Sequence, residues 1–388
     1  MESTEKSTIW ERFWGLDSVI GICYNVCVSV NVIGNVHIVV GWQAMRRRNK
    51  VTIKDVAQEV GVSAQTVSRV INNRPDVSPE TRVRVQNAIS DLGYAPNILA
   101  RSLIQGRSNT LGVVGFGLEL FGPTRVLAGI ERKSAELGFS LLLSLLDRLE
   151  PGRVNDIIGD LLSRQVDGII WAVPGHVNSF EWLDSWHKEV PVPTVFLNKD
   201  ESSGQEIVAM DNRRGASLAV EHLLARGYRR VGIITGPPAW WEAQEREAGW
   251  RSTMAAAGID NLDELRAEGD WSAASGDVGF QTLYSGDPAI EAVFACNDQM
   301  ALGALQAARR LGLGVPQDLA MVGFDDIPEA AYFCPSLTTV RQDPKALGAL
   351  AVERMYSMIQ ARQEEDTHSP GVSWIRPELI IRQSSVKE

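Results

Sequence analysis

From Asn109 to the C-terminus, short apolar runs alternate with stretches of helical periodicity. Several helical stretches end in a Leu-Gly or Arg-Gly pair, as at Leu137-Gly138 and Arg226-Gly227, and such a glycine is a helix stop signal. Regular alternation of strands and helices predicts parallel sheets with helices on both faces. The apolar runs that we expect to be strands are Leu111–Val114, Ser140–Leu145, Gly168–Val173, Thr194–Leu197, Val208–Met210, Arg230–Thr235, Ala292–Ala295, Ala320–Gly323, Thr338–Val340 and a last strand at Leu379–Ile381.

These runs form two units, residues 109–210 and 211–339, with later segments that extend to residue 388. The fold class expected is therefore α/β, with two doubly wound lobes in one body. In such folds ligands bind at the carboxyl ends of the strands, and between lobes where there are two.

The composition fits a soluble globular protein of two or three domains, with 388 residues of which 44% are hydrophobic and 22% charged. It excludes disordered, collagen-like and polytopic membrane proteins. Four cysteines are too few for a disulfide framework in so long a chain, so we expect a reducing cytosol. We expect no metal, no cofactor and no catalytic residue, because no cysteine or histidine has the spacing of a metal site or a catalytic triad.

A dinucleotide-binding enzyme is the alternative that the glycines of the first strand suggest. Gly112, Gly115 and Gly117 do not, however, form the G-x-G-x-x-G pattern, and no acidic residue ends a convincing second strand. The sequence therefore does not favour an enzyme.

Charge is unevenly distributed along the chain. The net charge is −10, yet residues 46–108 contain eleven Lys and Arg against five Asp and Glu. A small basic block joined to a large acidic body indicates a nucleic-acid-binding domain attached to a domain with another task.

Two short helices joined by a tight turn are expected within residues 52–71. Thr52 and Asp55 have the spacing of a capping box, and Gly61 supplies the stop and the turn. Ser63 can cap the next helix, which runs to Ile71 and has an apolar side and a polar side. A third helix begins at Ser78-Pro79 and ends before Gly93. This pattern predicts a helix-turn-helix that binds double-stranded DNA.

The polar side of the second helix carries groups that can read base edges. Gln and Arg can bond bases in two places, and a small Ala can contact a thymine methyl group; these candidate base-reading residues are Ala64, Gln65, Ser68 and Arg69. Other polar residues can bind phosphate, which positions the protein without specifying a sequence. The candidate phosphate contacts are Thr52, Ser63, Thr66, Asn72, Ser78, Thr81, Tyr94 and Asn97.

The spacing Asp-Val-Ala-x-x-x-Gly-Val-Ser-x-x-Thr-Val-Ser-Arg, together with Tyr94-Ala95-Pro96-Asn97 and Ala100-Arg101-Ser102-Leu103, resembles the lactose-repressor/galactose-repressor (LacI/GalR) family of transcription regulators. The resemblance extends from about Arg46 to the C-terminus. It implies a headpiece (46–95), a hinge (96–108) and a periplasmic-binding-protein-like effector and dimerisation domain (109–388). It also implies a cytoplasmic, nucleoid-associated homodimeric repressor that binds a pseudopalindromic operator.

Residues 98–105 can form a helix that is too short to be stable alone in water. The resemblance implies that two such hinge helices pair over the minor groove, with Leu103 wedged into a base step and Ala100 at the close approach. A plain interdomain linker is the alternative.

Polar and aromatic residues follow several strands of the second unit, and the resemblance assigns effector contacts to some of them. The candidate effector-binding residues are Trp240, Trp241, Arg246, Trp271, Asn297 and Asp325. Planar Arg, Asn and Asp groups can each pair with two sugar hydroxyls, and indole rings lie against sugar C–H faces. For each tryptophan, packing in the core or lid is the alternative.

The expected effector is a neutral sugar of the β-galactoside or β-glucoside type, because no Lys/Arg cluster that would hold a phosphate stands near these positions. Glu242 departs from the small hydroxyl residue expected in the closest galactoside sensors, which leaves the identity of the sugar open. The rival functions are a sugar-binding protein of a transport system and a regulator that binds purines or acts by protein contact. The helix-turn-helix and hinge argue against the transport protein.

Residues 18–45 contain no charged side chain and are followed by Arg46-Arg47-Arg48, as a membrane anchor would require. Three asparagines and a histidine interrupt the run, however. We expect residues 1–45 to be an upstream extension, with Met45 as the native start and no membrane contact. A membrane anchor over residues 18–42 and a soluble appendage remain alternatives.

Overall fold

The computed structural model describes residues 51–72, 74–95, 107–146, 151–173, 190–199, 204–364 and 366–387. The chain divides into two units, Met1–Pro96 and Asn97–Glu388. The predictions about residues 1–45 and about Asn97, Ala100 and Leu103 lie outside the described residues.

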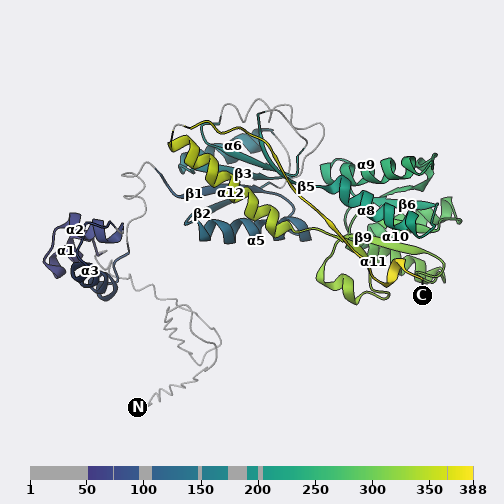
Figure 1. Cartoon of the computed structure of the whole chain (residues 1–388), viewed down its shortest axis with the longest axis horizontal. Helices are drawn as coiled ribbons and strands as arrows, with labels where there is room; N and C mark the ends of the chain where they lie inside the picture. Colours follow the sequence, from purple (N-terminus) through teal and green to yellow (C-terminus); the bar gives the residue numbers. More distant parts are fainter. Residues whose placement is uncertain are drawn as a thin grey trace, which may run out of the picture. The chain divides into compact units, whose positions relative to one another are not determined.

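Three helices form the headpiece: α1 (Ile53–Val60), α2 (Ala64–Ile71) and α3 (Pro79–Leu92) (Figure 1). The capping box between Thr52 and Asp55 starts α1, and Gly61 ends it with a φ of 71°. That left-handed conformation is one that glycine adopts without the steric cost of a side chain. Ser63 and Ser78 accept hydrogen bonds from backbone N–H groups in the first turns of α2 and α3. The apolar sides of the helices meet in one small core, formed by Val56, Ala57, Val60, Val67, Val70, Val85 and Ala88.

The first lobe of the body is built on a six-stranded sheet with the order β11-β5-β4-β3-β1-β2, in which all pairings are parallel. Its strands are β1 (Thr110–Gly115), β2 (Ser140–Leu145), β3 (Gly168–Ala172), β4 (Thr194–Leu197), β5 (Glu206–Met210) and β11 (Val372–Ile375).

Helices cover both faces of this sheet, because successive strand residues point to opposite sides. In β4, Phe196 packs in one cluster with Val154 and Leu161 of α6 (Pro151–Ser163). Its neighbours Val195 and Leu197 pack in another cluster with residues of α5 (Phe121–Glu136) and α12 (Pro344–Gln363). Continuous apolar strands of this kind are the signature of a sheet buried on both sides.

The second lobe repeats this plan with the order β12-β10-β9-β8-β6-β7, in which only β12 is antiparallel to its neighbour among the pairings described. Its strands are β6 (Val231–Thr235), β7 (Arg266–Glu268), β8 (Ala292–Ala295), β9 (Ala320–Asp325), β10 (Thr338–Arg341) and β12 (Glu378–Ile380). Its helices are α8 (Asn212–Ala225), α9 (Trp241–Ala256), α10 (Ala273–Gly286), α11 (Asp298–Arg310) and the short 3-10 turns η1 (Asp263–Leu265), η2 (Pro328–Tyr332) and η3 (Gln383–Ser385).

The predicted fold class is confirmed, and each of the ten expected strands is present, with shifts of one or two residues at some ends. The chain passes from one lobe to the other after β5, after β10 and after β11, so that α12 and β11 join the first lobe late in the sequence (Figure 1). Two strands escaped the strand prediction. β7 is only three residues long and mostly polar. β11 is followed by β12 rather than by a helix, so it falls outside the alternation of strands and helices on which the prediction rests.

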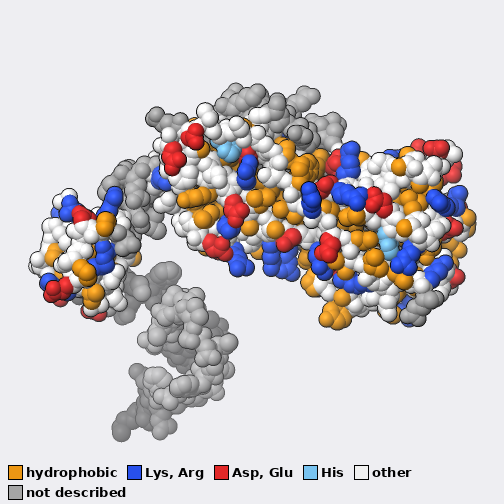
Figure 2. Space-filling view, in the orientation of Figure 1, with side chains coloured by type: hydrophobic (Ala, Val, Ile, Leu, Met, Phe, Trp, Pro, Cys, Tyr) orange, Lys and Arg blue, Asp and Glu red, His pale blue; other side chains and the backbone are white. Residues whose placement is uncertain are grey.

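Side chains of both charge signs are interspersed over the face of the body that Figure 2 shows. Among the described residues, no helix is both long enough and apolar enough to cross a membrane.

Candidate functional site

The second headpiece helix, α2, carries all four predicted base-reading residues. Ala64 and Ser68, and likewise Gln65 and Arg69, stand four residues apart and so lie along one side of the helix. Gln65 and Arg69 are exposed, and Ala64 and Ser68 are half-buried. The opposite side of α2 is buried through Val67 and Val70, which leaves the polar side available to a ligand.

The exposed guanidinium of Arg69 lies 3.4 Å from a carboxylate oxygen of Asp76. Both side chains are about half exposed, and ion pairs in water contribute little. This ion pair therefore keeps the Arg69 side chain near the surface of α2, and little free energy is needed to break it when Arg69 binds a base.

Hydroxyl groups gather at the first turns of the headpiece helices. The Ser63 and Thr66 hydroxyls are 2.9 Å apart, and the Ser78 hydroxyl donates to that of Thr81 at the same distance. Exposed helix N-termini with hydroxyl groups suit phosphate, because their free N–H groups and the helix dipole attract anions.

Three further predicted phosphate contacts also serve the headpiece itself. Thr52 caps α1. Asn72 donates from Nδ2 to the Ser68 carbonyl oxygen at 2.9 Å, and Tyr94 packs against the headpiece core.

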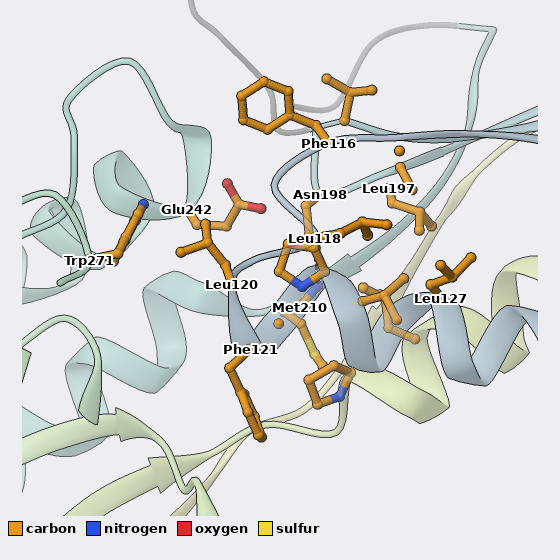
Figure 3. A pocket seen from close by; sticks show the side chains of 18 of the residues that line it. Phe116, Leu118, Leu120, Phe121, Leu127, Leu197, Asn198, Met210, Glu242 and Trp271 are labelled. Atoms are coloured by element: carbon orange, nitrogen blue, oxygen red, sulfur yellow. Dashed lines mark hydrogen bonds between the residues drawn. The ribbon is translucent and has the colours of Figure 1, made fainter. Parts of the chain in front are cut away.

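A cavity of about 330 Å³ lies between the two lobes of the body, at the carboxyl ends of the strands. The first lobe lines it mainly with apolar side chains, which Figure 3 shows around the opening. These include Phe116, Leu118, Leu120, Phe121, Leu127, Leu197 and Met210. The second lobe supplies most of the polar lining, in Glu242, Arg246, Asn297, Gln299, Asp325 and Gln342. The cavity thus has one apolar wall and one wall of hydrogen-bonding groups.

Arg246 reaches the cavity from α9 and is almost entirely buried. Its Nε donates to Oδ1 of Asn212 at 2.8 Å, and its Nη1 donates to the Cys296 carbonyl oxygen. The guanidinium stacks on the Phe324 ring at 3.9 Å and lies 5.4 Å from the Trp271 ring. These contacts fix the plane of the guanidinium.

Asp325 ends β9 opposite Arg246, with 3.8 Å between Oδ1 and Nη1. The same oxygen accepts a hydrogen bond of 2.9 Å from Nε2 of Gln342. Burial raises the pKa of Asp325 to about 6, although Arg246 and Gln342 oppose the rise. Arg246 therefore offsets part, but not all, of the effect of burial on the Asp325 carboxyl.

Trp271 follows β7 with a φ of 74°, and Asn297 holds it there. Asn297 donates from Nδ2 to the Trp271 carbonyl oxygen at 2.9 Å and accepts from the Met300 N–H at 2.8 Å. The Trp271 ring lies over Gly236: a Cβ at that glycine would stand 2.1 Å from Cη2 and Cζ2 of the indole. Asn297 thus positions Trp271 as well as lining the cavity.

The neighbouring residues Trp240 and Trp241 lie in different environments. Trp240 lines the cavity and makes edge contacts with Phe116 of the first lobe and Trp271 of the second, at centroid distances of 5.9 and 5.8 Å. Trp241 does not line the cavity. It is buried in the core of the first lobe and stacks on Trp374 at 6.5 Å. For Trp241 the structure agrees with the alternative, packing in the core. The prediction that Trp241 contacts the effector is not supported.

Sequence reasoning missed several polar residues of the cavity, among them Asn198, Glu242 and Gln342. Asn198 and Gln342 each directly follow a strand, a position that could have marked them. Glu242 had been noted only as a departure from a pattern. Burial raises its pKa above the usual value, against the influence of Arg246 and of hydrogen bonds from the Asn198 side chain and its own backbone.

The described ranges contain no group of three or more His, Cys, Asp or Glu side chains that could hold a metal ion.

Two family models match the chain. Residues 52–97 match the bacterial regulatory proteins of the lacI family, and residues 220–385 match a periplasmic binding protein-like domain. The Lactose operon repressor of Escherichia coli (strain K12) is 32% identical over 331 residues, which cover 85% of this chain and 91% of the relative. The Ribose operon repressor of the same strain is 36% identical, with coverages of 78% and 91%. A repressor named PurR from Edwardsiella ictaluri is 32% identical, with coverages of 86% and 96%.

Solved structures give the same picture. The lac repressor dimer bound to operator and the anti-inducer ONPF matches with a TM-score of 0.77 and 32% identity, over 87% of this chain and 99% of that one. The complex of the transcriptional regulator CelR with cellobiose matches with a TM-score of 0.63 and 30% identity, over 86% and 99%.

Proposed function

The chain belongs to the lacI family of bacterial regulatory proteins and is a DNA-binding transcriptional repressor; we propose that a small carbohydrate bound between its lobes controls its affinity for the operator. The observation that carries this proposal is the interlobe cavity, where Arg246, Asp325 and the Trp271 ring converge opposite an apolar wall.

The proposed DNA-binding form is a cytoplasmic homodimer on a pseudopalindromic operator. Two-fold symmetry would give each headpiece one half-site. The side of α2 with Gln65 and Arg69 would read base edges in the major groove. The hydroxyl groups at the N-termini of α2 and α3 would bind the flanking phosphates. We extend the proposal to the hinge, where Leu103 would wedge into a base step of the minor groove and Ala100 would stand at the close approach.

The polarity of the cavity supports a β-galactoside or β-glucoside as the effector. The fixed guanidinium of Arg246 and the carboxylate of Asp325 can each pair with sugar hydroxyls, and Trp240 and Trp271 offer rings for C–H faces. The apolar wall with Phe116 and Leu120 suits a second sugar ring or an apolar group joined through the glycosidic oxygen. The sugars of two relatives agree with this class, since lactose is a β-galactoside and cellobiose a β-glucoside.

Effector binding would act through the arrangement of the lobes. A ligand that contacts both walls favours one lobe arrangement over another, and the first lobe begins directly after the hinge. A change in lobe closure would alter the spacing of the two hinges in a dimer, and with it the pairing of their short helices. Coupling of this kind is typically about 1–3 kcal/mol, or roughly 5- to 150-fold in affinity.

A purine is the rival effector, because a repressor named PurR is also a relative. Isothermal titration of the full chain with lactose, cellobiose, adenine, guanine and hypoxanthine separates the two. We expect binding of at least one disaccharide and of no purine base. Purine binding without disaccharide binding would replace the carbohydrate proposal.

A further inference from the structure

Glu242, the second residue of α9, brings an acidic group to the cavity without a basic partner of its own. Among the described residues no ion pair includes Glu242, and the guanidinium of Arg246 lies within ion-pair distance of Asp325 instead. Oxygen Oε2 of Glu242 is shielded from solvent and has no hydrogen-bond partner in the described part of the chain. Figure 3 shows the carboxyl group among the cavity side chains, with Trp271 to one side.

A second polar atom of the cavity also lacks a hydrogen-bond partner. Nε1 of Trp271 is shielded and bonds to nothing within the ranges that the structure describes. The indole ring is packed against Gly236 and makes an edge contact with Trp240 at a centroid distance of 5.8 Å, so it cannot readily turn away to find a partner. The cavity therefore presents one unmatched acceptor and one unmatched donor.

A buried polar group that lacks a hydrogen-bond partner destabilises the protein, and more so if the group is charged. Two such groups at one cavity indicate that a ligand supplies what the protein does not. The partner of Glu242 must be a hydrogen-bond donor, and the partner of Trp271 must be an acceptor. Hydroxyl groups can be both.

We propose that Glu242 is a specificity-determining residue of the effector cavity: its carboxylate accepts hydrogen bonds from ring hydroxyls of the effector, while Nε1 of Trp271 donates to an effector oxygen. This inference rests on the proposed carbohydrate effector and narrows it. The ligand is a sugar whose hydroxyls are free on the side that faces α9.

The acidic groups of Glu242 and Asp325 also disfavour two other kinds of ligand: anions, and molecules that have only hydrogen-bond acceptors. A phosphate or carboxylate ligand would meet the acidic groups of Glu242 and Asp325, whereas Arg246 is the one basic residue among the described lining residues, and like charges repel. A ligand with acceptors only, such as a fully methylated sugar, would leave Oε2 of Glu242 without a hydrogen-bond donor. Discrimination of this kind can be large, because a site built to bond a hydroxyl is left with unmatched groups when the hydroxyl is missing.

Sugar binding is then linked to proton release. Burial raises the pKa of Glu242, and the charged groups that face it are Arg246, which opposes the rise, and Asp325, which adds to it. Hydrogen bonds donated by the sugar stabilise the ionised carboxylate and lower its pKa. Affinity for the sugar therefore rises with pH. Asp325 contributes in the same direction, so only the difference between the wild type and a Glu242 variant isolates Glu242.

The test is isothermal titration of the full chain with lactose, cellobiose, methyl β-D-galactopyranoside and methyl β-D-glucopyranoside at pH 5.5, 6.5, 7.5 and 8.5. The variants are E242Q, which has a side chain of nearly equal shape but no charge, and W271F, which loses only the indole N–H and part of the ring. The matched control is E264Q, the same change at an exposed residue of η1 outside the cavity. Thermal unfolding checks that every variant is folded, and E242D replaces E242Q if that variant is not.

For the sugar that binds the wild type, E242Q is expected to bind roughly ten- to a hundred-fold more weakly at pH 8.5, because a hydrogen bond to a charged group is lost. E242Q is also expected to show a flatter pH profile than the wild type. W271F is expected to bind more weakly by a factor that does not vary with pH, and E264Q to match the wild type. If E242D is used, it should bind more weakly and keep the pH dependence.

Equal affinity and an equal pH profile for wild type and E242Q, or for wild type and E242D if that variant is used, would overturn the role of Glu242 while leaving the carbohydrate proposal intact. If no sugar of the panel binds the wild type, both proposals fall.

Discussion

At the scale of single residues, the effector cavity is lined by backbones in unusual conformations. Asn198, Trp271 and Asp325 have φ angles of 47°, 74° and 108°, values that side-chain-bearing residues seldom adopt and that cost free energy. All three line the cavity. Strained residues concentrated at one site are typical of positions kept for ligand binding rather than for stability.

The contact between the Trp271 ring and Gly236 gives a direct test of how Trp271 is positioned in the cavity. Replacing Gly236 with Ala would put a Cβ 2.1 Å from two ring carbons of Trp271. We expect destabilisation of about 1–3 kcal/mol in urea denaturation, together with weaker sugar binding. Gly286→Ala is the control, because nothing stands within 4 Å of a Cβ there. Equal effects of the two substitutions would contradict the described packing.

Asp325 predicts a dependence of stability on pH. Its folded pKa, about 6, lies above the ordinary value of 3.8 for an aspartate, so the folded state binds the proton more tightly and loses stability as the pH rises from 3.8 through 6. Asp325→Asn removes that loss. The stability of the variant relative to the wild type should rise by about 1 kcal/mol between pH 5 and 7.5, measured by urea denaturation at each pH. A constant or falling difference would show that the Asp325 carboxyl is not held in its neutral form.

Arg69 tests base readout. Arg69→Ala should reduce discrimination between the preferred operator and a site with one altered base pair by about 1–3 kcal/mol, measured by competition binding. Arg309→Ala, at an exposed residue near the end of α11, is the control and should leave discrimination unchanged. Unaltered base preference in the Arg69 variant would assign base reading to other residues of α2.

At the scale of elements, periodicity and stop signals predicted most of the fold. Strands such as Ser140–Leu145 and Thr194–Leu197 were predicted to the residue, because short apolar runs between glycine and polar residues mark parallel strands. β7 was missed since its three residues carry no such pattern, and it exists through pairing with β6. Candidate cavity residues could be found where they follow strands. Trp240 lines the cavity, whereas Trp241 packs in a core. The direction in which α9 leaves β6 determines this difference, and the local sequence does not predict that direction.

The hinge is the element on which DNA bending is expected to depend. Leu103→Ala should weaken binding to the specific operator while sparing binding to unrelated DNA, because only the specific complex would repay the cost of opening a base step. Fluorescence anisotropy with both DNAs at equal salt measures this. Equal loss on both would indicate a plain linker.

At the scale of the whole molecule, three passages of the chain join two lobes that share one cavity. Phe116 from the first lobe and Trp271 from the second meet at Trp240, so the aromatic contacts span both lobes. A ligand that fills the cavity touches both lobes at once. Such an arrangement can couple a small molecule to a distant domain through a change in the relative position of the lobes.

The most direct test of this coupling is the affinity of the full chain for an operator selected from random duplex DNA, measured by anisotropy with and without a saturating sugar that binds in the titration. We expect the dissociation constant to change by roughly 5- to 150-fold, and the change to be lost with a sugar that does not bind. An operator affinity that stays the same while the cavity is filled would contradict carbohydrate control of this repressor.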